Sequence, residues 1–220
     1  AQEWAKTLLD DSQGVIEKVT KSKKKEAQRL PLSLSSLQVL AGKAFGYDPK
    51  QVLDTAQKLY ERKLTSYPRS DCYYLPSNQL SDGNVILNNL SRCGDRQLSH
   101  CAQGADINIK SKAWNDKKIT ANHAIIPTTV PCKVDSLSMQ ERNIYHLIAQ
   151  AYLAQFYPEH QYEQTHIEVK HHDELFVANG RVVIEQGWKA LYARKKKAAV
   201  GDIIDQMDAT QLRNVEEEAD

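Results

Sequence analysis

The chain has 220 residues, enough for one large or two small domains, and its 41% hydrophobic and 26% charged residues are typical of a globular protein in water. Its 29 Lys and Arg nearly balance its 28 Asp and Glu, so the total charge does not indicate a nucleic-acid partner. No apolar run reaches the length of a membrane span and no signal-peptide pattern opens the sequence, so we expect no membrane partner.

The first half of the chain predicts one β-strand followed by helices. Apolar and polar residues alternate over Val15–Thr20, and this strand runs into a lysine-rich stretch at 21–25. Helical spacing begins near Leu30, and Gly46 can end that helix. A second helix begins at Asp48, a good N-cap residue that precedes a proline. The remaining helices expected in this half cover residues 1–9 and 77–90.

The second half begins with a helix and ends in strands. Ser138 and Glu141 have the spacing of a capping box, which predicts a helix over residues 138–156. Alternation predicts a strand over residues 162–169. Asn179-Gly180 is typical of a type I′ turn, so we expect a hairpin there. The strands expected around and after that turn are 175–178, 181–184 and 200–207.

These elements predict an α+β chain in which a mainly helical domain is inserted into a β-rich domain. The first strand cannot bury a sheet by itself, so it should join the C-terminal strands in one sheet. We therefore expect a helical domain at residues 30–156 and a discontinuous β-rich domain at residues 1–29 and 157–220.

One short stretch, residues 64–76, carries a recognisable chemical pattern. Tyr67 lies two residues from Arg69, with hydroxyl side chains at Ser66 and Ser70. A phenol beside a fixed cation suits attack on a phosphate, because the cation favours the phenolate and can also bind the anionic phosphate. The alternative is a plain turn, because Pro68 and its neighbours are turn formers.

The four cysteines form no Cys-x-x-Cys pair, and no His or Cys has further ligands at metal-site spacing. We therefore expect no metal site within this chain.

The stretch at 64–76 resembles the active-site tyrosine motif of type IA DNA topoisomerases, and most closely that of the bacterial topoisomerase III branch. Three further segments resemble conserved parts of the same family and follow in the same order. They are Leu30–Gln38, Gln51–Glu61 and the block from Trp114 to Thr128.

The resemblance implies a catalytic helical domain carried on a β-rich hinge domain that arches over a hole wide enough for DNA. Tyr67 would be the nucleophile that forms a transient 5′-phosphotyrosyl link with single-stranded DNA, without ATP. Arg69 would hold the scissile phosphate. Ser66 and Ser70 would bind phosphate oxygens or merely satisfy the backbone of a turn.

In the second block, the resemblance implies DNA-backbone contacts at Lys117 and Lys118. The family often has histidine where this chain has Asn122, while His123 matches a second histidine of the topoisomerase III branch. Asn122 can donate a hydrogen bond to phosphate but cannot carry charge. Either His123 substitutes, or the site works without the usual imidazole.

The family's magnesium site lies in a Toprim domain, and nothing here resembles that domain. The resemblance therefore implies a central fragment that retains the nucleophile, with Mg²⁺ bound outside this chain. Its expected partners are single-stranded DNA and the remaining domains of the parent enzyme, in the bacterial cytoplasm on the nucleoid. By itself the fragment should bind DNA weakly and not cleave it.

Two other functions stay open. The chain could be a non-catalytic module for single-stranded DNA binding or docking that keeps the motif as ancestry. It could also be an unrelated tyrosine phosphodiesterase or recombinase, although those usually surround the tyrosine with several basic and histidine residues.

Overall fold

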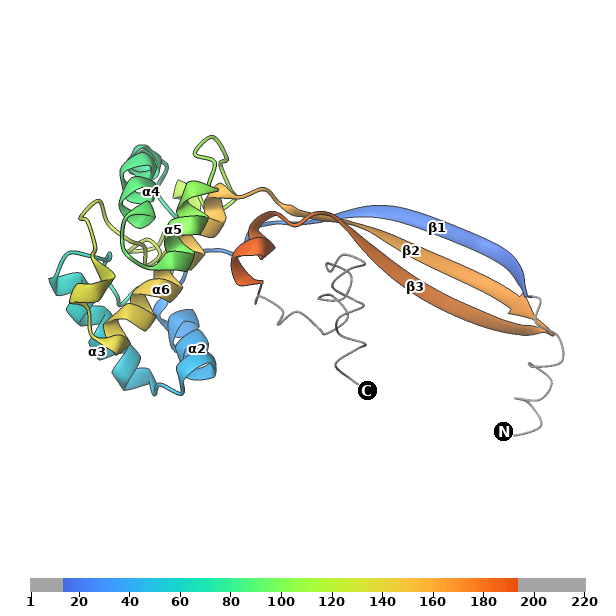
Figure 1. Cartoon of the computed structure of the whole chain (residues 1–220), viewed down its shortest axis with the longest axis horizontal. Coiled ribbons are helices and arrows are strands. Elements are labelled where there is room, and N and C mark those ends of the chain that lie inside the picture. The colour runs from blue at the N-terminus through green and yellow to red at the C-terminus, as the bar shows by residue number, and fades with distance from the viewer. Residues whose placement is uncertain (1–13, 194–220) are drawn as a thin grey trace, which may run out of the picture.

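A computed structural model of the chain describes residues 14–193. The helix predicted over residues 1–9 and the strand predicted over residues 200–207 lie outside this range. Figure 1 shows two parts: a cluster of helices at one end, and a long three-stranded sheet that extends away from it. The described chain is therefore α+β, as the sequence predicts.

The long sheet, which we call the arm, joins segments from the two ends of the described chain. β1 (Val15–Glu26) pairs antiparallel with β2 (His160–His171), and β2 pairs antiparallel with β3 (Glu174–Glu185). The strand order is β1-β2-β3. All the helices of the cluster lie between β1 and β2 in the sequence, which confirms that the first strand joins the C-terminal strands in one sheet.

The hairpin turn predicted at Asn179-Gly180 is wrong. Those residues lie within the continuous strand β3, where Asn179 pairs with His166 of β2. The turn is instead formed by His172 and Asp173, which both have positive φ, at 49° and 59°. A two-residue turn of this kind matches the right-handed twist of its strands, and it lies seven residues before the position that the sequence signal indicates.

The helices begin and end at the residues that the capping pattern indicates. Asp48 accepts a hydrogen bond from the backbone N–H of Gln51, and Ser138 accepts one from Glu141, each within a complete capping box. Gly46 ends its helix with φ of 71°, a conformation that favours glycine. The α-helices are α2 (Leu34–Phe45), α3 (Pro49–Glu61), α4 (Gly83–Ser91), α5 (Arg96–Gln103) and α6 (Met139–Leu153).

Short 3-10 segments modify two of the predicted helices. The helix expected over residues 77–90 is a 3-10 helix at Ser77–Asp82 followed by α4. The helix expected over 138–156 is α6 followed by a 3-10 turn at Ala154–Phe156. The sequence pattern did not indicate α5, whose N-cap Asp95 accepts hydrogen bonds from two backbone N–H groups.

The hydrophobic core lies in the helical part. α6 occupies its middle and packs against α2, α3 and α5. Tyr145, Tyr152 and Phe156 are the largest fully buried side chains of this core, and the Trp114 ring lies 6.1 Å from that of Phe156. No helix within residues 14–193 is both long and apolar enough to cross a bilayer.

A short 3-10 helix at Gly187–Tyr192 ties the arm to the helical part. Its Trp188 is buried, and the Trp188 indole N–H donates to the carbonyl of Glu26 at 3.1 Å. Gln150 of α6 donates to the Leu191 carbonyl at 2.7 Å. These contacts hold the ends of the two edge strands, β1 and β3, at the base of the arm.

Candidate functional site

The two sequence motifs lie side by side in the fold. The tyrosine segment leaves α3 and crosses the helical part beside residues 113–128, with which it shares backbone hydrogen bonds. They run from the Ser66 N–H to the Ile126 carbonyl (2.9 Å), from the Thr128 N–H to the Leu64 carbonyl (3.1 Å) and from the Ala124 N–H to the Tyr74 carbonyl (3.0 Å). Segments about 60 residues apart in sequence therefore form one surface.

Tyr67 and Arg69 both reach solvent on this surface. Tyr67 is 38% exposed, and its ring meets the Tyr60 ring edge-on with centroids 5.6 Å apart. Within residues 14–193, neither the Tyr67 hydroxyl nor the Arg69 guanidinium has a hydrogen bond or an ion pair, while Pro68 between them is buried. Both groups are thus held at the surface by a fixed backbone and remain available to a ligand.

Ser66 and Ser70 are engaged with the second motif. The Ser66 hydroxyl donates to the Ala124 carbonyl at 3.2 Å and accepts from the Ile126 N–H at 2.9 Å. Ser70 is buried, and its hydroxyl donates to the Asn122 carbonyl at 3.3 Å. These bonds hold the backbone on either side of Tyr67 and Arg69.

Asn122 and His123 differ in how they are bound. The Asn122 side chain is exposed and has no hydrogen bond within residues 14–193, whereas the Asn122 backbone carbonyl accepts from Ser70. His123 is half-buried, with its Nδ1 2.7 Å from the Ala124 carbonyl oxygen and its Nε2 3.3 Å from the Gln79 amide nitrogen. Because a carbonyl oxygen can only accept, Nδ1 is the donor to Ala124, and both ring nitrogens are engaged within the fold.

The two lysines of the second motif lie on a 3-10 turn at Asp116–Lys118. Lys118 donates to the Tyr74 hydroxyl at 3.2 Å and lies 4.9 Å from the centre of that ring. Lys117 is exposed. Lys118 is therefore held close to the tyrosine segment, whereas Lys117 projects into solvent.

Tyr73 lies six residues after Tyr67 in the same segment. The pKa of Tyr73 is lowered by hydrogen bonds at the start of α2. The bond with the Ser33 hydroxyl has the larger effect, and the bond with the Ser35 hydroxyl has the smaller one. Tyr73 is 38% exposed and keeps a polar group on the motif surface without a positive charge.

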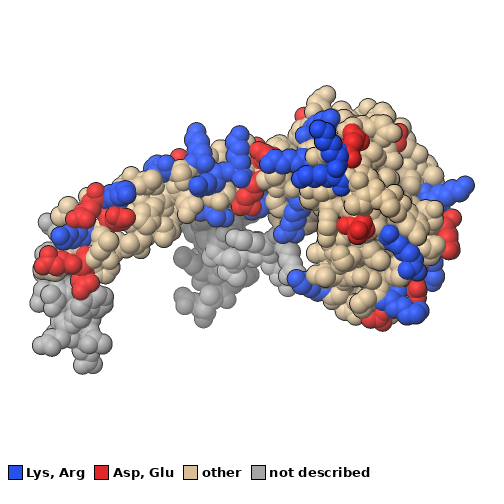
Figure 2. Space-filling view, turned by 180° about the vertical axis from the view of Figure 1, so that it is seen from behind, with Lys and Arg blue, Asp and Glu red and all other residues tan. Residues whose placement is uncertain are grey.

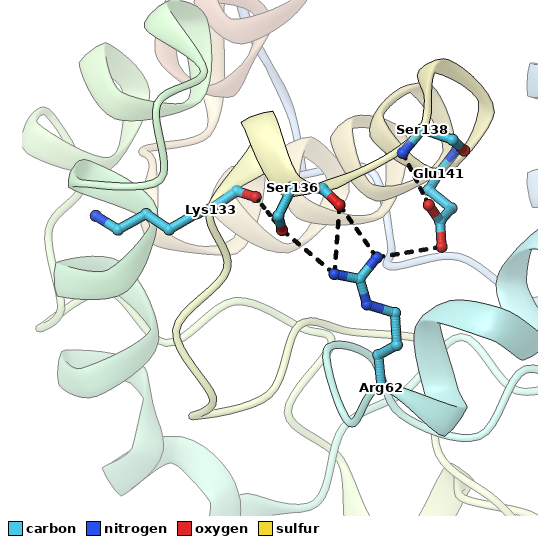
Figure 3. Close-up of polar contacts among 5 residues, drawn as sticks. All are labelled: Arg62, Lys133, Ser136, Ser138 and Glu141. Atoms are coloured by element: carbon cyan, nitrogen blue, oxygen red, sulfur yellow. Dashed lines mark hydrogen bonds and ion pairs between the residues drawn. The ribbon is translucent and has the colours of Figure 1, made fainter.

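Arg62 fixes the end of the helix that leads into the tyrosine segment (Figure 3). Its guanidinium donates to the Ser136 hydroxyl at 3.3 Å and pairs with the Glu141 carboxylate at 3.4 Å. Glu141 also accepts from the Ser138 N–H at 2.8 Å in the capping box of α6. The C-terminus of α3 is thereby joined to the N-terminus of α6, and the sequence pattern gave no sign of this contact.

Positive charge gathers at the base of the arm, near the helical part (Figure 2). β1 carries the exposed lysines Lys21, Lys23, Lys24 and Lys25. Arg181 of β3 lies 3.9 Å from the centre of the Tyr162 ring. Such a surface attracts a polyanion, although the net charge of the chain is only +1.

Comparison with known proteins gives the same family as the motifs. A family model described as DNA topoisomerase matches residues 1–219. DNA topoisomerase 3 of Vibrio cholerae is 42% identical over 168 residues, which cover 76% of this chain and 26% of the relative. DNA topoisomerase 3 of Haemophilus influenzae is 39% identical over 205 residues, which cover 84% of this chain and 30% of the relative.

The fold has a counterpart among solved structures. Full-length topoisomerase I from Thermotoga maritima superposes on 90% of this chain and 33% of its own length, with a TM-score of 0.62 and 20% identity. The chain itself spans 26–30% of the length of the two curated relatives. It therefore belongs to the DNA topoisomerase family, in agreement with the resemblance of its motifs to the type IA enzymes of the topoisomerase III branch.

Proposed function

We propose that the chain is the part of a type IA DNA topoisomerase that carries the nucleophile, and that Tyr67 attacks the backbone of single-stranded DNA. The observation that carries this proposal is an exposed tyrosine, free of other hydrogen bonds within residues 14–193, two residues from an equally free Arg69. Family membership supplies the substrate class.

The proposed step exchanges one phosphate ester for another. The Tyr67 oxygen forms a bond to phosphorus and loses its proton, while the bond from phosphorus to the 3′-oxygen breaks and that oxygen gains a proton. The phosphate at the 5′ end of the downstream strand stays linked to Tyr67, and the upstream strand ends in a free 3′-hydroxyl. Attack by the 3′-hydroxyl reverses the step, so the phosphodiester energy is retained and no ATP is needed.

Arg69 has the chemistry to position the scissile phosphate. A guanidinium offers two parallel N–H donors that match two phosphate oxygens and stabilise the charge that builds up during attack. Lys117, Lys118 and the Asn122 side chain are the nearby exposed groups that we assign to the DNA backbone, and the lysines at the base of the arm would add sequence-independent attraction.

We assign no direct DNA contact to Ser66, Ser70 or His123. Their side-chain hydrogen bonds are already used within the fold. Their proposed role is to hold the loops that carry Tyr67 and Arg69.

The proposed magnesium requirement belongs to the rest of the parent enzyme. Within residues 14–193, no three His, Cys, Asp or Glu side chains lie close enough together to hold a metal ion. The chain alone should bind single-stranded DNA without cutting it. The proposed location of the parent enzyme is the nucleoid in the bacterial cytoplasm.

The proposal can be tested by trapping the covalent link. The 220-residue chain is mixed with a labelled single-stranded oligonucleotide, with and without the separately expressed remainder of the parent enzyme and Mg²⁺, and denatured. We expect a slower-migrating labelled adduct only when the remainder is supplied, and none with Tyr67→Phe.

Tyr60→Phe is the matched control, because it removes a neighbouring exposed hydroxyl and leaves both rings in contact. It should keep the adduct. Salt-sensitive DNA binding with no adduct under any condition would instead favour the non-catalytic binding module.

A further inference from the structure

A small hollow lies next to the tyrosine segment. It has a volume of about 180 Å³, and one of its walls is Ser66, the residue that precedes Tyr67. Its apolar part is formed by Ile86, Ile126 and Pro127. A hollow of this size is smaller than the usual site for a drug-sized ligand and suits a single ring system.

The polar wall of the hollow has unused hydrogen-bond acceptors. Gln79 and Asp82 both line it and lie three residues apart on the 3-10 helix Ser77–Asp82, where such residues face the same way. Since the Gln79 amide nitrogen donates to His123, the Gln79 carbonyl oxygen is left to accept. The Asp82 carboxylate is half-buried and has no hydrogen bond or ion pair with any residue between 14 and 193.

The charge of the wall excludes a phosphate as the occupant. None of the described residues that line the hollow is Lys or Arg, and Asp82 contributes a carboxylate. The Asp82 carboxylate and the Gln79 amide oxygen are hydrogen-bond acceptors, so a fitting occupant supplies N–H donors. A fitting occupant also has flat, apolar faces that can pack against Ile86 and Pro127.

We propose that this hollow receives one base of the bound DNA strand, next to the phosphate that Tyr67 attacks, and prefers a base with an exocyclic amine. This inference rests on the proposed function. Cytosine, adenine and guanine each present amine N–H donors to acceptors such as Asp82. Thymine has no amine, and its one ring N–H is flanked by two carbonyl oxygens that a carboxylate repels.

The test uses strands that carry a single base. Nine-nucleotide strands made of abasic residues receive one central cytosine, adenine, guanine or thymine, and binding to the intact 220-residue chain is measured by fluorescence anisotropy. The all-abasic strand measures the phosphate contacts alone. We expect each amine-bearing base to tighten binding by about ten-fold over the abasic strand, and thymine by much less.

Asp82→Asn keeps the size of the side chain and removes its charge. It should reduce the gain from cytosine, measured against the all-abasic strand with the same variant, to within about two-fold. Asp54→Asn, on the exposed face of α3, is the matched control and should keep the full gain. Thermal melting of each variant confirms that it is folded.

The outcomes separate this inference from the proposed function. If all single-base strands bind equally well, or if Asp82→Asn keeps the full gain, the base site is wrong and the proposed function stands. If neither these strands nor ordinary single-stranded DNA bind at all, both proposals are wrong.

Discussion

At the scale of single residues, Arg69 and His123 differ in whether their side chains are already bound within the fold. Arg69 is exposed and has no hydrogen bond within the described part of the chain, so its charge is available to a phosphate. His123 has both ring nitrogens engaged by neighbouring groups of the fold. The two residues should therefore affect DNA binding in different ways.

We expect Arg69→Gln to reduce the salt dependence of single-stranded DNA binding, because each phosphate contact contributes about 0.7 to the slope of log K against log salt concentration. His123→Gln should leave that slope unchanged. Anisotropy titrations at several salt concentrations measure both slopes. Equal slopes for Arg69→Gln and the unmodified chain would contradict a phosphate contact at Arg69.

Residue types predict part of this site and hide the rest. Tyr67 and Arg69 are proposed from their spacing together with the resemblance of residues 64–76 to a family motif, and neither signal needs tertiary information. The acceptors at Gln79 and Asp82 were missed. Their meaning depends on a 3-10 helix meeting a segment more than 40 residues away, and no local pattern encodes that contact.

At the scale of elements, local signals predict helices better than turns. The cap at Asp48, the capping box at Ser138 and the stop at Gly46 all lie where the sequence predicts them. Asn179-Gly180 failed as a turn signal because the pairing of β3 with β2 along its whole length outweighs a two-residue preference. Strand register is a tertiary property, whereas a helix cap is formed within one turn of chain.

Gly187 lies at the junction between the arm and the helices and should not tolerate a larger side chain. Gly187 has φ of 55°, and a Cβ there would meet the carbonyl oxygens of Pro158 and Glu159. Gly187→Ala should therefore lower the free energy of unfolding by about 2 kcal/mol, measured by urea denaturation. Displacement of Trp188, which donates to the Pro158 carbonyl, should accompany the loss as a change in tryptophan fluorescence.

Gly180→Ala is the matched control for Gly187→Ala. Gly180 lies within β3, and an added Cβ there would meet no atom within 4 Å. It should leave the stability nearly unchanged. Similar losses for the two variants would contradict the strained junction.

At the scale of the whole molecule, burial is concentrated at one end. Most residues of α6 are buried, whereas every residue of β3 is exposed. Three apolar residues of β3 are each at least half exposed: Val182, Val183 and Ile184. Hydrogen bonds between the strands therefore stabilise the arm more than burial of apolar side chains does. The helical part should therefore be the more stable of the two.

Hydrogen exchange measures this difference directly. We expect amides of α6 to exchange orders of magnitude more slowly than those of the edge strand β3, because local opening costs least where few apolar contacts are lost. The same protection in both elements would show that the arm is stabilised by contacts outside residues 14–193.

The central claim is that Tyr67, and no other residue, forms the covalent bond to DNA. Mass spectrometry of the trapped adduct after protease and nuclease digestion tests it most directly. We expect a single nucleotide-bearing peptide from residues 64–76, with the phosphate on Tyr67. A phosphate on Tyr60, Tyr73 or any residue outside that segment would contradict it.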